Sequence, residues 1–260
     1  MSFIKPEFQH RFPSIKKWLK QYGYLGEVNS TELASLDEDS LALKNALEKF
    51  QNFYDYNLIG DPDGIAGPKT LYAMSVPRCG HPDFEDPEFG FRAIGKGSWP
   101  EPCQKAGVKV SVDKSKLPSK LKASIDSIIQ RVFKAYAGVG LKLVLVDSDA
   151  NIRVSWRNLA GSTIGLAEFN NESCSDSVFC YLDPSYAPND QQVVDLLAHE
   201  MGHNCNLEHT RGSDPNVMNS YILTAASDPW STKDPSYKTL VKYFSGEPID
   251  QPIIYDYLLI

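Results

Sequence analysis

Eleven residues in the last quarter of the chain constrain its fold and chemistry more than any other stretch. The segment from His199 to His209 reads HEMGHNCNLEH and holds three of the five histidines in the chain. If it begins within a helix, His199 and His203 lie one turn apart on the same face. Neutral imidazoles placed in this way can both bind one Zn²⁺ at about 2.0–2.1 Å. The pattern therefore predicts a helix over residues 191–204 that carries two zinc ligands.

The neighbouring residues complete a catalytic rather than a structural zinc site. His209 follows six residues after His203, which lets the helix end and the chain fold back with a third ligand. Three protein ligands leave the fourth zinc position for water. Glu200 lies beside the first ligand, where its carboxylate can hold this water and take its proton. The alternative is a helix with two histidines by chance, which the concentration of histidine in this stretch disfavours.

Composition and charge narrow the class of protein. With 42% hydrophobic and 23% charged residues, the 260-residue chain is expected to fold into one or two domains. Its net charge of -7 fits poorly with non-specific nucleic-acid binding, which needs clustered Lys and Arg. No apolar run approaches the roughly 18 residues that predict a membrane span. We expect a monomer without a nucleic-acid partner or a membrane span.

The sequence leaves the compartment and the disulfides open. The N-terminus has no continuous apolar segment, so no ordinary signal peptide is visible. The chain could be cytosolic, exported without a leader, or already processed. An odd cysteine count suggests one free thiol and up to two disulfides among Cys103, Cys174, Cys180 and Cys205. Cys174 and Cys180 are near enough to close a short loop, and five free thiols in a reducing compartment is the alternative.

Hydrophobic periodicity divides the chain into a helical part and a mixed part. Residues 1–78 show helical spacing in two segments, followed by a turn and a short helix over 68–74. Residues 79–107 are rich in Pro, Gly and charge and are typical of a linker. Residues 108–260 alternate strand and helix patterns, which predicts an α+β domain. Its expected strands cover 108–112, 141–146, 152–156, 164–169 and 178–182, and its expected helices cover 117–137, 191–204 and 235–244.

The histidine segment resembles the long zinc motif of the metzincins, His-Glu-x-x-His-x-x-Gly-x-x-His. The chain departs from this motif at Asn206, which stands where the family has Gly. A left-handed backbone is needed there to turn the chain, and Asn tolerates it best among the other residues. Met218, nine residues after His209, is the candidate for the Met-turn that forms an apolar floor under the metal. The resemblance implies a mixed twisted sheet with three helices.

A second segment, PRCGHPD at residues 77–83, matches all six fixed positions of the cysteine switch of the matrix metalloproteinases. The resemblance implies that the Cys79 thiolate holds the fourth zinc position and excludes water. It also implies that Arg78 pairs with a carboxylate that fixes the loop. A structural or disulfide-bonded Cys79 is the alternative. The chain is thus similar to a secreted, latent zinc endopeptidase that acts on proteins or peptides after another protease cuts between about residues 80 and 107.

The resemblance extends to other segments. Residues 22–25 and 50–54 look like prodomain helix ends, and residues 63–71 resemble the peptidoglycan-binding-like fold. The expected organisation is therefore a three-helix prodomain over 1–78, a switch and activation linker over 79–107, and a catalytic domain over 108–260. Residues 164–169 look like the edge strand of the substrate cleft, to which an extended peptide adds by backbone hydrogen bonds. The candidate substrate-binding residues are Gly165, Leu166, Ala167 and Tyr221.

Further metal sites have weaker support in the sequence. Only His10 and His81 lie outside the zinc motif, so the second, structural zinc of vertebrate-type matrixins is not expected. No calcium loop is recognisable. Surface acids usually only solvate a loop, but Ca²⁺ remains possible at Asp147, Asp149, Asp176 and Asp183.

Two other functions remain to be weighed. Residues 1–78 could bind a cell-wall glycan and target the protease to it, although a switch cysteine directly after this unit favours inhibition. The chain could also be an inactive scaffold that zinc stabilises, which the intact Glu200 disfavours. The apolar tail over 253–260 has no assigned role; it could pack against the catalytic domain or contact a partner.

Overall fold

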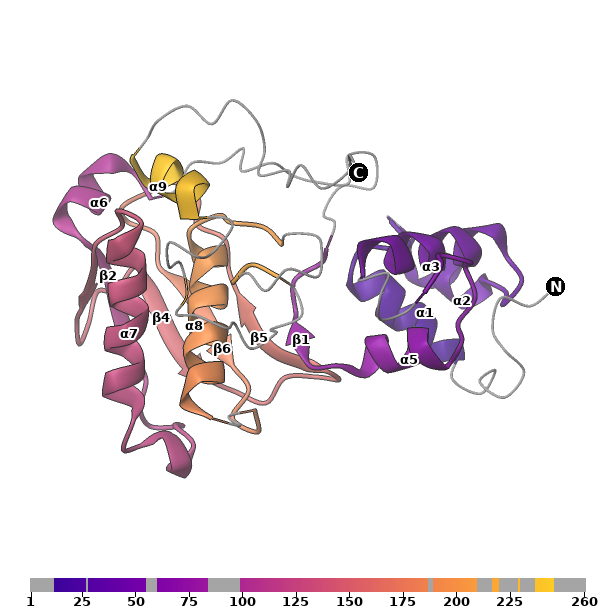
Figure 1. Ribbon diagram of the computed structural model, residues 1–260, viewed down its shortest axis with the longest axis horizontal. Coiled ribbons are helices and arrows are strands. Elements are labelled where there is room, and N and C mark those ends of the chain that lie inside the picture. The colour runs from indigo at the N-terminus through magenta and orange to yellow at the C-terminus, as the bar shows by residue number, and fades with distance from the viewer. Residues whose placement is uncertain are drawn as a thin grey trace. The chain divides into compact units, whose positions relative to one another are not determined.

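The computed structural model describes residues 12–26, 28–54, 60–83, 99–186, 189–209, 217–219, 229 and 237–245. These residues form two compact units (Figure 1). The first contains the described residues up to Val76 and those from His81 to Asp83. The second contains Pro77–Gly80 and the described residues from 99 onward. No helix among the described residues is long and apolar enough to cross a membrane.

The first unit is helical. Apolar residues at three- and four-residue spacing, including Leu19, Leu43 and Phe50, are fully buried between its helices. Ser40 caps the longest helix by accepting a hydrogen bond from the backbone N–H of Leu43. Its described helices are α1 (Phe12–Gln21), α2 (Ser30–Ser35), α3 (Leu41–Phe53) and α5 (Pro68–Ser75). The short α2, which carries no buried residue, was not predicted because it has no apolar face.

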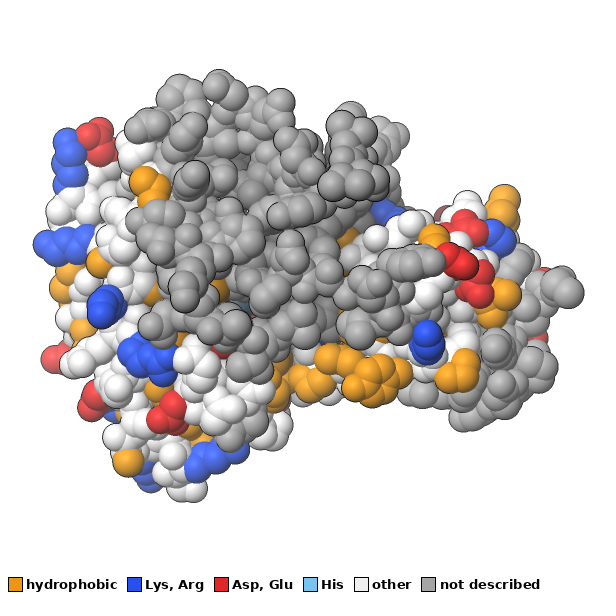
Figure 2. Space-filling model, in the orientation of Figure 1, with side chains coloured by type: hydrophobic (Ala, Val, Ile, Leu, Met, Phe, Trp, Pro, Cys, Tyr) orange, Lys and Arg blue, Asp and Glu red, His pale blue; other side chains and the backbone are white. Residues whose placement is uncertain are grey.

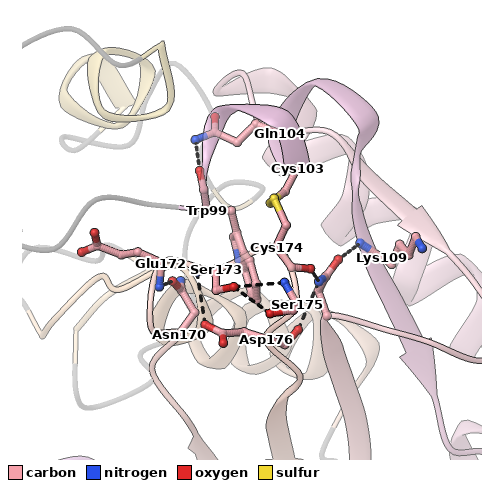
Figure 3. The surroundings of a disulfide bond; sticks show 11 residues. Trp99, Cys103, Gln104, Lys109, Asn170, Glu172, Ser173, Cys174, Ser175 and Asp176 are labelled. Carbon is pink, nitrogen blue, oxygen red and sulfur yellow. Dashed lines mark hydrogen bonds between the residues drawn. A yellow bond between two sulfur atoms is a disulfide. The ribbon is translucent and has the colours of Figure 1, made fainter.

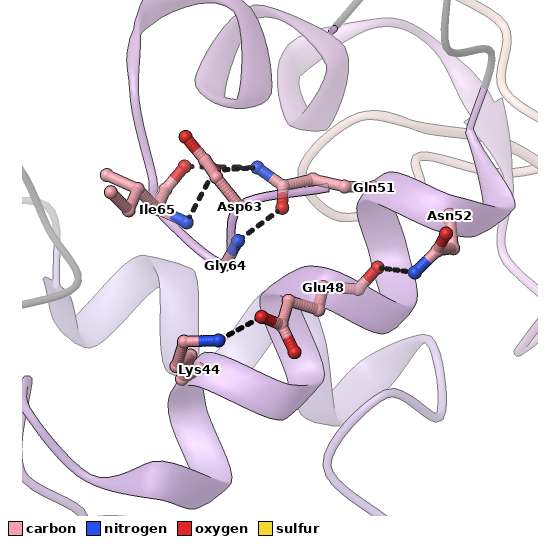
Figure 4. A network of polar contacts seen from close by, with 7 residues as sticks. All are labelled: Lys44, Glu48, Gln51, Asn52, Asp63, Gly64 and Ile65. Carbon is pink, nitrogen blue, oxygen red and sulfur yellow. Dashed lines mark hydrogen bonds and ion pairs between the residues drawn. The ribbon is translucent and has the colours of Figure 1, made fainter. Parts of the chain in front are cut away.

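A buried glutamine fixes the loop over residues 60–67 that leads into α5 (Figure 4). Gln51 accepts a hydrogen bond from the backbone N–H of Gly64 at 2.8 Å. Its amide donates to Asp63 Oδ1 at 2.9 Å and to Thr70 Oγ1 at 3.2 Å. Gly64 has φ +69°, a conformation that side chains rarely adopt. The polar groups of this loop therefore serve the folding of the first unit.

The second unit is built on a six-stranded mixed sheet in the order β1-β5-β6-β4-β2-β3. Its neighbouring strands are parallel except for β5 and β6, which are antiparallel. The alternation of buried Val108 and Val110 with exposed Lys109 is typical of a sheet with one covered face. The strands are β1 (Arg78–Cys79), β2 (Val108–Val112), β3 (Leu143–Leu145), β4 (Ile152–Trp156), β5 (Thr163–Ala167) and β6 (Val178–Leu182).

Two long helices, α7 (Ile125–Gly138) and α8 (Asp190–Asn204), lie side by side over the sheet (Figure 1). The Tyr136 hydroxyl on α7 donates to the carbonyl of Ala198 on α8 at 2.8 Å, which joins the two helices inside the core. Two shorter helices, α6 (Glu101–Ala106) and α9 (Tyr237–Ser245), lie at one end of this layer (Figure 1). On the face drawn in Figure 2, Lys and Arg side chains stand apart from one another.

The mixed α/β architecture agrees with the predicted fold class, and two local predictions need correction. The helix expected over 117–137 is broken, because a 3₁₀ turn, η2 (Ser119–Leu121), precedes α7. The segment 79–107 is not all linker, because β1 includes Cys79 at its start and α6 forms near its end. The helix 191–204 is confirmed as α8, with Asn189 as its N-cap.

One disulfide joins Cys103 on α6 to Cys174 in the β5–β6 loop, with 5.6 Å between their Cα atoms (Figure 3). The suggested Cys174–Cys180 loop is therefore wrong, and so is the alternative of five free thiols. Cys79, Cys180 and Cys205 are buried free thiols. The sequence could not choose this pair, because it brings together residues 71 positions apart.

Candidate metal centre

The helix α8 places the first two histidines as the sequence predicts. His199 and His203 lie one turn apart, and neither is more than 1% exposed. Their Nε2 atoms are 3.1 Å apart. The helix is buried from Val193 to its last residue, because it packs against α7, β5 and β6. The two candidate metal ligands thus lie inside the unit.

The third histidine returns to the pair through a tight turn. Asn206 has φ +61°, the left-handed conformation expected at this position. The backbone N–H of Leu207 donates to the carbonyl of Gly202 at 3.0 Å, which closes the turn on the end of α8. His209 is then brought back so that its Nε2 lies 3.2 Å from that of His203. The Nε2 atoms of the three histidines in the motif therefore lie close together.

Backbone carbonyls orient two of the rings. Nδ1 of His199 lies 2.6 Å from the carbonyl oxygen of Val217, and Nδ1 of His203 lies 2.7 Å from that of Leu207. Carbonyls only accept, so each Nδ1 carries a proton, and in the neutral ring each Nε2 then presents a lone pair. These lone pairs face each other at close range, which is unfavourable unless a cation lies between them. Nitrogens of a tetrahedral zinc site stand about 3.3–3.4 Å apart, so the residues fit zinc.

Cys79 completes a buried group of four ligand atoms. Its Sγ lies 3.4 Å from Nε2 of His203, and the four ligand atoms lie within 4.8 Å of one another. The strand β1 holds the cysteine there, because Arg78 and Cys79 pair in parallel with Thr163 and Gly165 of β5. The N–H of Gly80 extends the pairing to the carbonyl of Gly165 at 2.8 Å. Among the described residues, this group is the one arranged for a metal ion.

Arg78 is fully buried beside this cysteine, and its Nε donates to the carbonyl of Cys79 at 3.2 Å. This contact lets the guanidinium support the backbone at Cys79 directly. Its expected pairing with a carboxylate stays a prediction.

Glu200 lies beside the four ligand atoms and is fully buried. Its Oε2 is 3.6 Å from Sγ of Cys79, and its Oε1 has no hydrogen-bond partner. Burial raises the pKa of this carboxyl to about 8, with the Cys79 contact acting in the opposite direction. A dication held by the histidines would lower the pKa again. The carboxylate therefore lies at the site, and no hydrogen bond holds its Oε1.

Two glycines make room for this arrangement, and sequence reasoning did not assign them that role. A Cβ on Gly165 would lie 2.2 Å from Oε1 of Glu200, so the edge strand leaves space for the carboxylate. A Cβ on Gly202 would lie 2.4 Å from Sδ of Met218. Met218, which is 3% exposed, therefore packs against the helix between its two histidines. Gly202, which lies between His199 and His203 in the sequence, was the signal that could have indicated this close packing.

The remaining candidate residues are placed as follows. Gly165, Leu166 and Ala167 lie on β5, with Leu166 half-buried and the other two buried. Tyr221 lies outside the described residues.

The calcium candidates have mixed surroundings. Asp183 accepts hydrogen bonds from the N–H groups of Leu159 and Ser185, and Asp176 accepts from that of Asn171. These two carboxylates therefore organise loops. Asp147 and Asp149 are exposed, and Asp149 has φ +53°.

Comparison with known proteins gives one partial match. No family model matches the chain. The chain is 33% identical over 76 residues to Metalloendoproteinase 4-MMP of Arabidopsis thaliana, a match that covers 29% of this chain. The chain spans about a fifth of that relative, 19% of its length. This likeness and the buried group of one cysteine and three histidines both favour a metal-dependent protease.

Proposed function

We propose that the chain is a latent zinc-dependent endopeptidase of the matrix metalloproteinase type. The observation that carries the proposal is the convergence of three Nε2 atoms and one Sγ, with an unpartnered carboxylate oxygen on Glu200 beside them. A structural zinc site has no use for such a carboxylate. Three histidines are also the ligand set of a catalytic zinc site, and the fourth ligand, Cys79, comes from a separate strand, β1.

The zinc ligands and Glu200 would have different roles in peptide-bond hydrolysis. Bound zinc supplies a Lewis acid that polarises the scissile carbonyl and lowers the pKa of an attacking water. His199, His203 and His209 would hold it. Glu200 accepts a proton from the water as it attacks the carbonyl carbon, and then delivers this proton to the leaving amine nitrogen.

Latency would rest on two contacts of the same short strand. Cys79 takes the position that water needs at the metal. The strand β1 also occupies the edge of β5, where an extended peptide would add by backbone hydrogen bonds. Both contacts must be lost before a substrate can bind, and without the metal contact the pairing of this two-residue strand would not hold it at the edge. The strand therefore inhibits at the metal and at the substrate-binding edge together.

The first unit would act as the prodomain that holds this strand in place. Asp83, at the end of the switch segment, belongs to that unit, where its N–H donates to the carbonyl of Tyr22 and its carboxylate accepts from the Tyr24 hydroxyl at 2.5 Å. We propose residues 1–78 as this prodomain, 79–107 as switch and activation segment, and 108–260 as catalytic domain. A cut after the switch by an activating protease would release the first unit with Cys79.

The disulfide supports an extracellular location, because such bonds persist in oxidising compartments. We propose a secreted monomer that cleaves proteins or peptides. Glycan binding by the first unit is the less favoured role, since Gln51 already bonds Asp63 and Thr70 of the motif that resembles peptidoglycan-binding modules.

A fluorogenic-peptide assay on the full chain tests the proposal, with bound zinc measured in parallel. The untreated protein should be silent and become active after limited proteolysis or a thiol-reactive mercurial. Cys79→Ser should be active without treatment. Glu200→Gln should keep one zinc per chain and lose activity under every condition. An active Glu200→Gln, or a wild-type chain that binds no zinc, would refute the mechanism.

A further inference from the structure

Three buried asparagines join the turn between the second and third histidines to the segment that follows β5. The turn begins at Asn204, the last residue of α8, and contains Asn206; Asn170 lies three residues beyond the end of β5. Asn170 and Asn204 are fully buried, and Asn206 is 4% exposed. Most buried polar side-chain atoms have a hydrogen-bond partner, although Oδ1 of Asn204 has none. The contacts of these amides therefore show which parts of the backbone they hold together.

Asn170 is at the centre of this group. Its Nδ2 donates to the carbonyl of Asn204 at 2.7 Å, which is one of the last carbonyls of α8 and has no partner within the helix. Its Oδ1 accepts from the N–H of Glu172 at 2.7 Å (Figure 3). The same oxygen accepts from Nδ2 of Asn206 at 3.3 Å. One side chain thus contacts both turn residues and its own loop.

The turn is held to the sheet by a second set of bonds. Nδ2 of Asn204 donates to the carbonyls of Glu168 at 2.8 Å and of Phe179 at 3.0 Å. The Phe169 ring packs edge-on against the ring of His203, with 5.6 Å between centroids. The segment after β5 therefore contacts the metal centre from the side of its second histidine.

We propose that Asn170 is a positioning residue for the metal centre. It fixes the turn that carries the chain from His203 to His209, and so sets the separation of these two ligands. The departure from the family motif takes part in this role: Asn206 supplies the left-handed backbone and also a side-chain bond to Asn170, which a glycine cannot make. The inference rests on the proposed zinc site.

Asn151 provides a matched control in the same unit. It is also buried, and its Nδ2 donates to the carbonyls of Cys174 and Asp176, while its Oδ1 accepts from the N–H of Lys109. It therefore organises the other end of the β5–β6 loop with a similar set of bonds. None of these bonds reaches α8 or the turn after it.

The test is the zinc dissociation constant of the full chain, measured by competition with a fluorescent chelator, together with urea unfolding. Asn170→Ala should raise the dissociation constant by about 10-fold or more, the effect typical of residues that orient metal ligands. Asn151→Ala should raise it less than about twofold for a comparable loss of stability. Asn206→Gly, which keeps the left-handed turn, should raise it about threefold, with no further effect when combined with Asn170→Ala.

The outcomes separate this inference from the proposed function. If the wild-type chain binds zinc and Asn170→Ala binds it equally well, the positioning role is overturned and the zinc site stands. Equal weakening by Asn170→Ala and Asn151→Ala would show a general stability effect and also overturn it. If Asn170→Ala does not fold, Asn206→Gly decides, because unchanged zinc affinity in that variant removes the link to the turn. A wild-type chain without zinc affinity would overturn the proposed function itself.

Discussion

Adding one methyl group at Gly165 should separate the role of Glu200 from metal binding. A Cβ at this position would lie 2.2 Å from Oε1, 2.5 Å from Cδ and 2.7 Å from Cγ of Glu200. Because ordinary contacts begin near 3.4 Å, the carboxylate must move by about 1 Å. A displacement of about 1 Å can lower a reaction rate about 100-fold, equivalent to about 2.7 kcal/mol in the activation barrier. Gly165→Ala should therefore lose activity while it keeps its zinc.

The assay is kcat/KM on a fluorogenic peptide after proteolytic activation, with zinc content measured on the same samples. Gly138→Ala is the matched control, since a Cβ there meets nothing within 4 Å. It should retain wild-type activity. Wild-type kcat/KM in Gly165→Ala would refute the placement of Glu200 as the base. Loss of zinc together with activity would show that the methyl group disturbs the ligands instead.

Three further substitutions test the disulfide, the packing at Gly202 and the charge of Asp183. Replacing Cys103 and Cys174 by serine should lower the free energy of unfolding by up to about 4 kcal/mol, measured in urea, because a loop spanning 71 positions is released. Gly202→Ala should destabilise the zinc-loaded chain by about 1–3 kcal/mol, since the new methyl group overlaps Met218. Its melting temperature should therefore fall, and a rise would contradict this. Burial alone would raise the pKa of Asp183, but hydrogen bonds from neighbouring groups outweigh it and lower the pKa. The stability that this carboxylate contributes is therefore present above its ordinary pKa of 3.8 and is lost as the pH falls through the lower pKa of the folded state. Asp183→Asn should be about 1–3 kcal/mol less stable than wild type at pH 7. The two proteins should be equally stable in strong acid, where the carboxylate of the wild type is protonated.

The sequence was most informative where a local pattern decides the structure. His199 and His203 fall on one helix face by spacing alone, and the left-handed turn at Asn206 follows from the residues that tolerate it. Five of the six described strands were predicted, and buried residues alternate with more exposed ones along β2, β4 and β6; the two-residue β1 was not predicted. These predictions needed no knowledge of what packs against each element.

The rest depended on contacts between distant segments. Nothing near Cys103 indicates Cys174 as its partner, because the pairing follows from how α6 meets the β5–β6 loop. The space beside Gly165 exists only because α8 crosses β5 with Glu200 facing it. The break before α7 was missed since residues 117–121 continue an apolar pattern although their backbone forms a 3₁₀ turn.

The pairing of β1 with β5 also bears on solubility. A sheet edge with unpaired N–H and C=O groups can pair with any extended chain, including another copy of itself. In this structure, which we propose to be the latent form, β1 covers this edge. Loss of β1 would create a surface for substrate and a site for self-association at the same moment. Storage as the latent form would then keep the protein dispersed at concentrations where the activated form aggregates or digests itself.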